Sequence, residues 1–425
     1  MGADSACIFE DIGELTRGAA SCATHDSKGK KKEGRNKCNV PRRSRLFTCG
    51  FSCKTLSAKN QGISGKARKT VLSEGTGSSG KTFEGTVQHV ALSRPLVVLL
   101  ENVDDLTKED SSNLACLWDM FAQINYGGAM LPLTTSHFGL PQHRRRAWIV
   151  LLDCLQLEIT LGEARAKATD MLALCARLGS LGNAGDLNTF LLDDDDEVVE
   201  DELCRKLMAA KGEKEGCDWW SQHEQFVRSK GYTCSALRKY VKDIEDTEWY
   251  DALKAREKAA LSYGLTIQGK EEKGPLLAVD ISQRVDRMAY SYGCAFNTLC
   301  PASKWWIVER KRLLTGWESL RLQGFPMQWV EKARADAADA EQKCVLAAAS
   351  GPSDPLLADL AGNAFSGPVV QAALIGMLTL WPEPLTQPAH RHNLKKPGVD
   401  PSHGAASSSA GPDTLAVVMD CLMDE

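Results

Sequence analysis

The sequence predicts an α/β protein in which helices cover the faces of a β-sheet. Three apolar segments with the length of buried strands recur at residues 46–50, 95–100 and 147–152. A helical segment stands between the second and third of them, at residues 111–124. Its apolar residues repeat at helical spacing: Leu114, Leu117, Trp118, Phe121 and Ile124. Strands that alternate with helices are typical of this fold class.

Length and composition exclude several classes of protein. The chain has 425 residues, 43% of them hydrophobic, which allows one large core or two moderate ones. We find no signal peptide and no apolar run of about 18 residues, and therefore expect a protein that is neither secreted nor membrane-spanning. The 15 cysteines are scattered without a Cys-x-x-Cys pair. This distribution argues against a metal site or a disulfide framework and favours a reducing compartment.

Charge is distributed unevenly along the chain. Residues 1–150 contain 21 Lys and Arg against 14 Asp and Glu, a net charge of +7, whereas the remainder contains 30 against 41, or −11. A basic first part suits a polyanionic partner, and a solvated basic loop explains it equally well. Residues 26–45 are basic and of low complexity, which indicates a surface insertion or a nuclear-import signal.

Composition predicts four regions. Residues 1–153 contain the strand segments and form the first part of the sheet domain. Residues 154–285 are acidic and helical, and form an insertion whose basic segment, 228–242, is the candidate for contact with phosphate. Residues 286–383 return to the sheet domain and close it. Residues 384–425 are rich in Pro, Ser and Gly and are predicted to be disordered.

Two reactive side chains stand at the ends of predicted strands. Cys53 follows the strand at 46–50, and Glu101 follows the strand at 95–100. A thiol and a carboxylate at one edge of a sheet suggest a nucleophile and a proton donor that face one pocket. A buried structural cysteine and a carboxylate that caps a turn are the alternative interpretation.

Five short motifs follow one another in a fixed order. They are Gly50-Phe51-Ser52-Cys53, Glu101-Asn102-Val103, Gln142-His143-Arg144-Arg145-Arg146, residues 312–326, and Leu360-Ala361-Gly362-Asn363-Ala364-Phe365. In this order they resemble the C5-cytosine DNA methyltransferase family, over most of residues 8–153 and 280–380. The resemblance implies a Rossmann-like class I methyltransferase sheet, with residues 154–285 as the target-recognition region. It further implies S-adenosyl-L-methionine as the cofactor, DNA as the substrate and the nucleus as the location.

The same resemblance assigns catalytic roles. Cys53 would add to C6 of a cytosine that has left the stacked helix, and Glu101 would hold its N3 and exocyclic amine. Asn102 would orient the loop that carries Cys53. Arg144 and Arg146 would steady the thiolate, the flipped base and its phosphate. In the segment 312–326, which is architectural in the family, Glu318 and Arg321 stand three residues apart, and a helical ion pair between them is expected.

Cofactor contacts are implied at four positions. Asp11 and Ile12 resemble the family's contact with the adenine ring, and Asn363 with Ala364 resembles the last motif, which lines the same pocket. The family's glycine-rich turn has no counterpart before Asp11. We therefore expect the sheet to be incomplete on its N-terminal side, and a partner or a missing N-terminal segment to complete the cofactor site.

The residues beside Cys53 depart from the family pattern. Ser52 stands where the family favours proline, and Lys54 replaces a polar neighbour. We expect the ammonium group of Lys54 to lower the pKa of the Cys53 thiol.

Three other functions are compatible with the sequence. One is a catalytically impaired methyltransferase-like protein that binds nucleic acid or a partner, and another is an RNA cytosine C5 methyltransferase. The third is nucleotide binding, because residues 75–82 satisfy the P-loop pattern. A P-loop should follow a buried strand, and the preceding residues 66–74 are too polar to form one.

Overall fold

The computed structural model describes residues 11–22, 37–42, 44–57, 62–108, 111–210, 219–231, 241–268, 275–293, 295–326 and 354–380. The predicted tail at 384–425, most of the basic tract at 26–45 and residues 232–240 of the basic segment lie outside this description.

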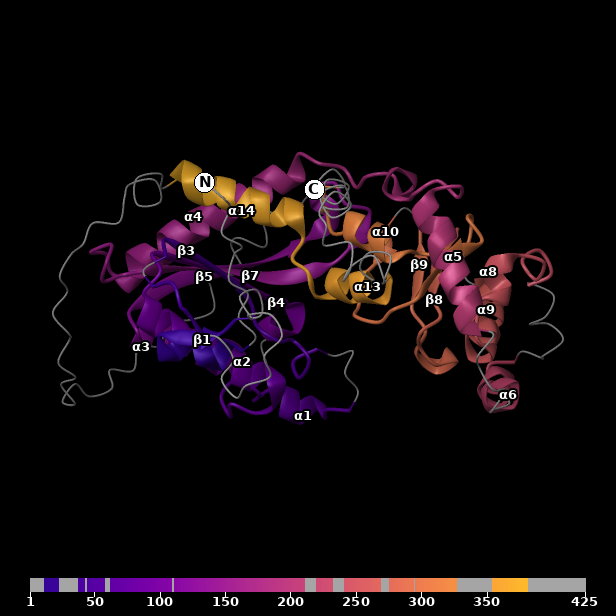
Figure 1. The fold of residues 1–425 in the computed structure, drawn as a ribbon. Helices are drawn as coiled ribbons and strands as arrows, with labels where there is room; N and C mark the ends of the chain where they lie inside the picture. The colour runs from indigo at the N-terminus through magenta and orange to yellow at the C-terminus, as the bar shows by residue number, and fades with distance from the viewer. Residues whose placement is uncertain are drawn as a thin grey trace. The chain divides into compact units, whose positions relative to one another are not determined.

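The main sheet has four strands in the order β3-β4-β7-β5 (Figure 1). These are β3 (Leu46–Gly50), β4 (Val97–Val103), β7 (Arg145–Asp153) and β5 (Tyr126–Thr134). β3 and β4 are parallel, whereas β7 runs antiparallel to both β4 and β5. The predicted α/β class and its three predicted strands are confirmed.

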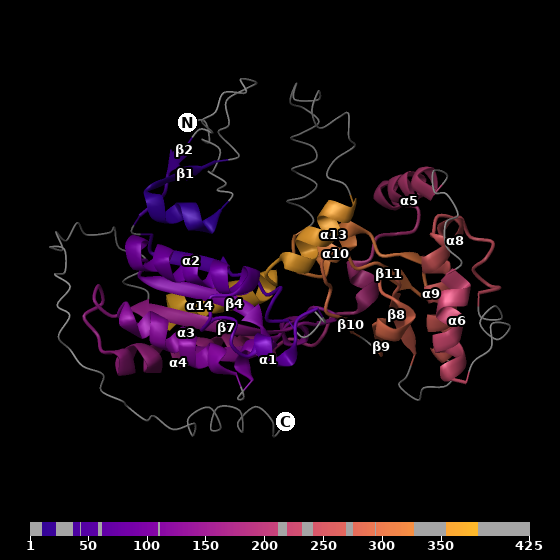
Figure 2. The same cartoon turned by 90° about the horizontal axis from the view of Figure 1, so that it is seen from below.

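Helices cover both faces of this sheet (Figures 1 and 2). On one face lie α2 (Gly77–Ser93) and α3 (Ser112–Gln123), the second of which confirms the predicted helix. Phe83 of α2 and Phe121 of α3 are buried there against Leu100 and Ile149 of the sheet. The other face carries α4 (Leu161–Ser180) and α14 (Gly367–Leu380).

Strand β5 was not predicted because glycine and proline interrupt its apolar pattern. The glycines are required by close packing. A Cβ added at Gly128 would lie 2.0 Å from the carbonyl oxygen of Val150 on β7, and one added at Gly127 would lie 2.8 Å from Cβ of Ala164 on α4. Helix α4, which falls in the predicted insertion, thus packs on the main sheet.

Residues Asp354–Leu380 are long and apolar enough, by length and composition, to cross a membrane, with 33% of the apolar window buried. We did not expect such a run. In the structure the helix is interrupted between α13 (Asp354–Asn363) and α14, and Val369 and Met377 of α14 are buried. Part of α14 packs along α4, while Ile375 and Leu378 remain 49% and 46% exposed.

A second sheet was not predicted. It is antiparallel, with the order β12-β11-β8-β9: β12 (Arg312–Leu313), β11 (Trp305–Ile307), β8 (Leu276–Asp280) and β9 (Tyr290–Tyr292). Strands of two to five residues are too short for periodicity to reveal. The predicted helices of the insertion are present as α5 (Glu197–Ala210), α6 (Trp219–Ser229), α8 (Glu248–Asp251) and α9 (Ala255–Gln268). Figure 2 shows α9 beside β8 and α6 against α9.

Shorter elements complete the described chain. They are the 3-10 helix η1 (Ile12–Arg17), β1 (Ala19–Ser21), β2 (Lys37–Asn39), α1 (Gly65–Arg68), the parallel pair β6 (Gln142–His143) and β10 (Phe296–Asn297), and α10 (Gly316–Arg321), with four further 3-10 turns at Asp104–Thr107, Thr135–Phe138, Leu187–Phe190 and Val285–Arg287.

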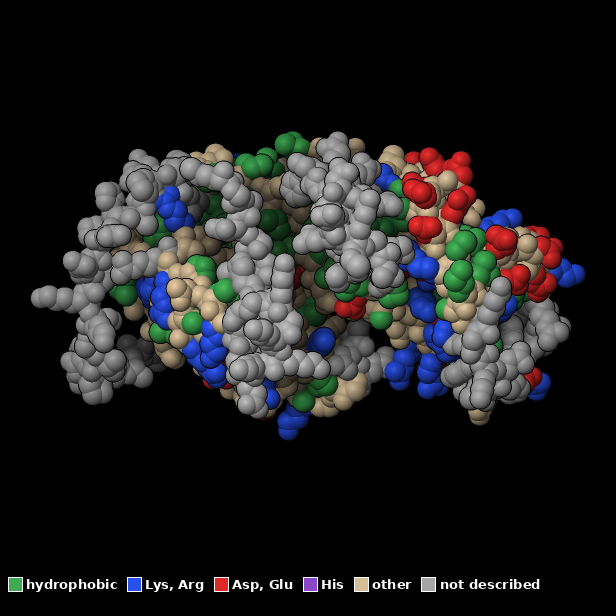
Figure 3. All heavy atoms as spheres, in the orientation of Figure 1, with side chains coloured by type: hydrophobic (Ala, Val, Ile, Leu, Met, Phe, Trp, Pro, Cys, Tyr) green, Lys and Arg blue, Asp and Glu red, His purple; other side chains and the backbone are tan. Residues whose placement is uncertain are grey.

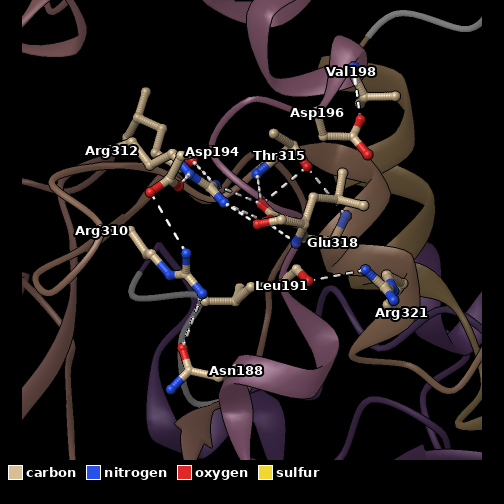
Figure 4. A network of polar contacts seen from close by, with 12 residues as sticks. Asn188, Leu191, Asp194, Asp196, Val198, Arg310, Arg312, Thr315, Glu318 and Arg321 are labelled. Atoms are coloured by element: carbon tan, nitrogen blue, oxygen red, sulfur yellow. Dashed lines mark hydrogen bonds and ion pairs between the residues drawn. The ribbon is translucent and has the colours of Figure 1, made fainter.

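The predicted ion pair between Glu318 and Arg321 is wrong. Both carboxylate oxygens of Glu318 bind Arg312, at 2.9 and 3.0 Å, in a buried network with Asp194 (Figure 4). Arg321 instead donates to the carbonyl oxygen of Leu191. Glu318 also closes the capping box of α10, so its carboxylate points toward the start of the helix and away from Arg321.

A buried carboxylate at the start of α13 predicts a pH-dependent contribution to stability. Asp354 accepts a hydrogen bond from the amide of Gly316 and faces Glu202 and Lys206 of α5. Burial, and next the negative charge of Glu202, raise the pKa of Asp354 to about 7 from an ordinary value of 3.8. The folded state therefore binds the Asp354 proton more tightly than the unfolded state does. The stability that this protonation gives the fold is lost as pH rises from about 4 to about 7.

We therefore expect the stability difference between the native chain and an Asp354→Asn variant to decrease over that pH range. Urea unfolding at half-unit pH steps measures it. Asp359→Asn, at an exposed position on the same helix, is the control and should give a constant difference. A constant difference for Asp354→Asn as well would contradict the prediction.

Candidate active site

Cys53 and Glu101 come together because β3 and β4 are parallel neighbours. Gly50, the last residue of β3, pairs with Glu101 of β4, so the carboxyl ends of the two strands meet. The loop after β3 then carries Cys53, which is partly buried against the core beneath α2 and α3. The two side chains are close enough for the charge of Glu101 to influence the thiol.

The carboxylate of Glu101 is buried beside two guanidinium groups. Arg146 Nε lies 3.1 Å from its Oε1, and Arg144 Nη2 lies 4.0 Å from the same atom. Burial raises the pKa of Glu101, and the two arginines oppose that rise without cancelling it. The carboxyl group therefore keeps its proton to a higher pH than an exposed glutamate, as a proton donor requires.

The pKa of the Cys53 thiol is also raised, and burial is the largest cause. Arg146 and Arg144 act in the opposite direction, and Glu101 adds to the rise. The pKa of the thiol is therefore not lowered overall, and Lys54 is not among the main groups that shift it. The Lys54 side chain is exposed, where water screens its charge.

Asn102 connects the Cys53 loop to β4. Its Nδ2 donates to the carbonyl oxygen of Phe51 at 2.9 Å, and its Oδ1 accepts from the amide of Val103 at 2.8 Å. The side chain is 1% exposed. Since Phe51 lies two residues before Cys53, this bridge fixes the start of the loop.

Arg144 lies beside Glu101 and is also held by backbone carbonyl groups. It is 3% exposed, and its guanidinium donates to the carbonyl oxygens of Leu299, Gly362 and Ala364 at 3.3, 3.3 and 2.9 Å. Burial, with the charge of Arg146, lowers the pKa of Arg144 to about 10. The residue thus fastens the turn between α13 and α14 to the site, and its charge also favours the Cys53 thiolate. Its contact with a phosphate stays a prediction.

Phe365 belongs to the site and was not singled out from the sequence. A Cβ added at Gly50 would come within 2.7 Å of Phe365 Cε1 and 3.5 Å of Glu101 Oε2. The ring centroid also lies 5.8 Å from that of Trp148. Phe365 is therefore an apolar wall beside Glu101, and its place directly after Asn363-Ala364 was the only signal.

The four positions implied for cofactor binding do not form one site among the described residues. Asp11 is exposed and accepts a hydrogen bond from the amide of Gly13, while Ile12 packs on Gly85 of α2. The amide of Asn363 donates to the carbonyl oxygen of Asp359 in its own helix, and the Ala364 carbonyl is bound by Arg144. No described contact joins the two pairs. Their contact with S-adenosyl-L-methionine stays a prediction.

The P-loop interpretation of residues 75–82 is wrong. The segment leads into α2 and follows the helix α1 and a turn, with no strand before it. The amide of Ser79, which a phosphate would need, donates instead to Oγ1 of Thr55 at 3.0 Å. Lys81 is exposed.

Residues 23–344 match the sequence model of a family described as C-5 cytosine-specific DNA methylase. A relative from Cryptococcus neoformans var. grubii, named DNA (cytosine-5-)-methyltransferase DMT5, is 24% identical over 422 residues. The alignment covers 92% of this chain and 16% of that protein.

Solved structures of methyltransferases are similar at low identity. Schizosaccharomyces pombe Dnmt2 is 14% identical with a TM-score of 0.34, covering 81% of this chain and 79% of that one. Entamoeba histolytica EhMeth is 10% identical with a TM-score of 0.33, covering 80% and 77%.

Proposed function

Since this chain belongs to the C-5 cytosine-specific DNA methylase family, we propose that it methylates cytosine at C5 in DNA through a covalent adduct of Cys53. The observation that supports this most strongly is the meeting of Cys53 and Glu101 at adjacent strand ends. Neither residue alone would indicate this reaction. A thiol with a proton donor beside it is the arrangement that cytosine activation requires.

The chemistry assigns each group a task. The Cys53 thiolate forms a bond to C6, and the electron pair of the C5–C6 double bond moves into the ring. The carboxyl group of Glu101 donates its proton to N3 and neutralises the charge that reaches it. C5 is then electron-rich. Arg146 holds the carboxyl group of Glu101 in place, and Asn102 holds the start of the Cys53 loop. After C5 has accepted an electrophile, its hydrogen leaves to solvent as a proton and the thiolate is eliminated from C6. The N3 proton then returns to Glu101, which restores the ring and both side chains.

The methyl donor, by family resemblance, is S-adenosyl-L-methionine, and the nucleus is the proposed location. We propose residues 1–153 and 286–383 as the catalytic domain and 154–285 as the target-recognition region. Two features cross these bounds: α4 of the insertion packs on the main sheet, and β9, β11 and β12 form the second sheet with β8 of the insertion. Acidic side chains gather over α5 and α8 (Figure 3), so phosphate should avoid that face.

Exchange of the C5 hydrogen tests the proposal without a methyl donor. Addition of Cys53 to C6 allows C5 to take up a solvent proton, so DNA tritiated at cytosine C5 should release tritium to water. The native chain is expected to release it, and Cys53→Ser to release none above background. Tritiated RNA is the parallel substrate. Release from RNA alone would contradict the choice of DNA, and release by Cys53→Ser at the native rate would exclude the covalent mechanism.

A further inference from the structure

The Cys53 loop is bound to the first turns of α2 by hydroxyl groups. Ser79 Oγ accepts from the amide of Thr55 at 3.0 Å, and Thr55 Oγ1 accepts from the amide of Ser79 at 3.0 Å. On the other side of Cys53, Thr82 Oγ1 accepts from the amide of Ser52 at 3.0 Å. The Ser52 hydroxyl adds a bond to Ser78 at 3.2 Å. Hydrogen bonds on both sides of Cys53 therefore join the loop to the first turns of α2.

The reciprocal pair between Ser79 and Thr55 also completes the helix. The first amides of a helix have no partner within it. Thr76, at the N-cap of α2, makes no side-chain capping bond. Thr55 supplies an acceptor to Ser79 from outside the helix, and Ser79 is fully buried. Movement of the loop would thus leave the buried amide and hydroxyl of Ser79 without these hydrogen-bond partners, which costs free energy.

Thr82 is oriented for its contact with Ser52. Its hydroxyl hydrogen is directed to the carbonyl oxygen of Ser78 at 2.8 Å, which leaves a lone pair free for the amide of Ser52. A proline at position 52 would have no N–H to donate and would need no such acceptor. In this chain the hydrogen bond from the Ser52 amide to Thr82 restrains the loop in place of the proline ring.

We propose that Ser79 and Thr82 are positioning residues that hold Cys53 in register with the base, an inference that rests on the proposed function. The backbone is fixed at Phe51 by Asn102, at Ser52 by Thr82 and at Thr55 by Ser79. Cys53 lies within this fixed stretch. Misplacement of a nucleophile by about 1 Å can reduce a rate about 10²-fold.

Alkylation of Cys53 in the full chain measures the loop directly. Iodoacetamide labelling, followed peptide by peptide by mass spectrometry, should be about 3- to 10-fold faster in Thr82→Val, because loss of one hydrogen bond opens the loop by about that factor. Thr82→Ser keeps the hydroxyl and should restore the native rate. Thr55→Val removes the partner of Ser79 from the loop side and should accelerate labelling similarly.

Ser93→Ala is the matched control. Its hydroxyl donates to the carbonyl four residues earlier, as that of Thr82 does, but it lies at the other end of α2. It should leave labelling unchanged. In the tritium-release assay, Thr82→Val should lower kcat by a factor similar to that of the labelling change and leave KM for DNA unaltered.

Two results would overturn the inference. One is a native labelling rate in both Thr82→Val and Thr55→Val, and the other is a kcat unchanged in a variant whose loop has loosened. Absence of tritium release by the native chain would instead refute the proposed function, and labelling would still show whether the hydroxyls hold the loop.

Discussion

A Glu101→Gln chain is expected to release tritium from cytosine C5 about 10²- to 10⁴-fold more slowly than the native chain. The amide of glutamine can hydrogen-bond to N3 but cannot deliver a proton to it. Binding of DNA should change little, because Glu101 is buried behind Arg146 and does not face phosphate. Single-turnover release and DNA binding, measured on the same preparation, separate the two effects.

The pH profile distinguishes a proton donor from a structural carboxylate. Burial raises the pKa of both Cys53 and Glu101. The rate should increase as pH rises through the pKa of the thiol, which must lose its proton, and decrease as pH rises through the pKa of Glu101, which must keep it. In Glu101→Gln the decrease at higher pH should disappear.

Asp104→Asn is the matched control for this substitution. Asp104 follows the same strand and forms an ion pair with Arg145 at 3.3 Å, but the two side chains are 38% and 51% exposed, whereas Glu101 is buried. Surface pairs contribute about 0–1 kcal/mol, so this change should alter the rate no more than about fivefold. A Glu101→Gln rate within the same limit would show that Glu101 is not the proton donor.

The parts of the site that the sequence predicted are those carried by strand ends. The segments at 46–50 and 95–100 are short and mainly apolar, so the positions of Cys53, Glu101 and Asn102 after them could be deduced. The parts that it did not predict depend on contacts between distant residues. Arg144 and Ala364, which are joined by a hydrogen bond, stand 220 residues apart. No local pattern distinguishes a guanidinium that binds phosphate from one that binds a carbonyl group.

Local rules also failed where burial outweighed them. The spacing of Glu318 and Arg321 predicted a helical ion pair, because i,i+3 neighbours meet on a helix surface. Glu318 is 0% exposed, however, and its nearest cation comes from β12. A buried carboxylate binds the guanidinium that is buried with it, and Arg312 is that group.

A Glu318→Ala substitution is therefore expected to lower the free energy of unfolding by about 3–5 kcal/mol, the effect of leaving a buried charge without its partner. Arg312 is 1% exposed and would keep its bonds to two carbonyl groups, but its one remaining charged partner in the described contacts would be Asp194, whose side chain is 55% exposed. Urea unfolding measures the change. A double variant, Arg312→Met with Glu318→Leu, removes both charges and should recover most of the loss.

Helix α4 provides a control for the capping contribution. Its capping box has the same geometry, since Glu163 accepts from the Thr160 amide at 2.8 Å and Glu318 accepts from the Thr315 amide at 2.8 Å. Glu163 is exposed and no arginine pairs with it in the described contacts, so Glu163→Ala should cost only about 0.5–1 kcal/mol. The excess cost at Glu318 then measures the buried pair with Arg312. Equal costs at both sites would mean that the cap, and not the ion pair, accounts for the stability of α10.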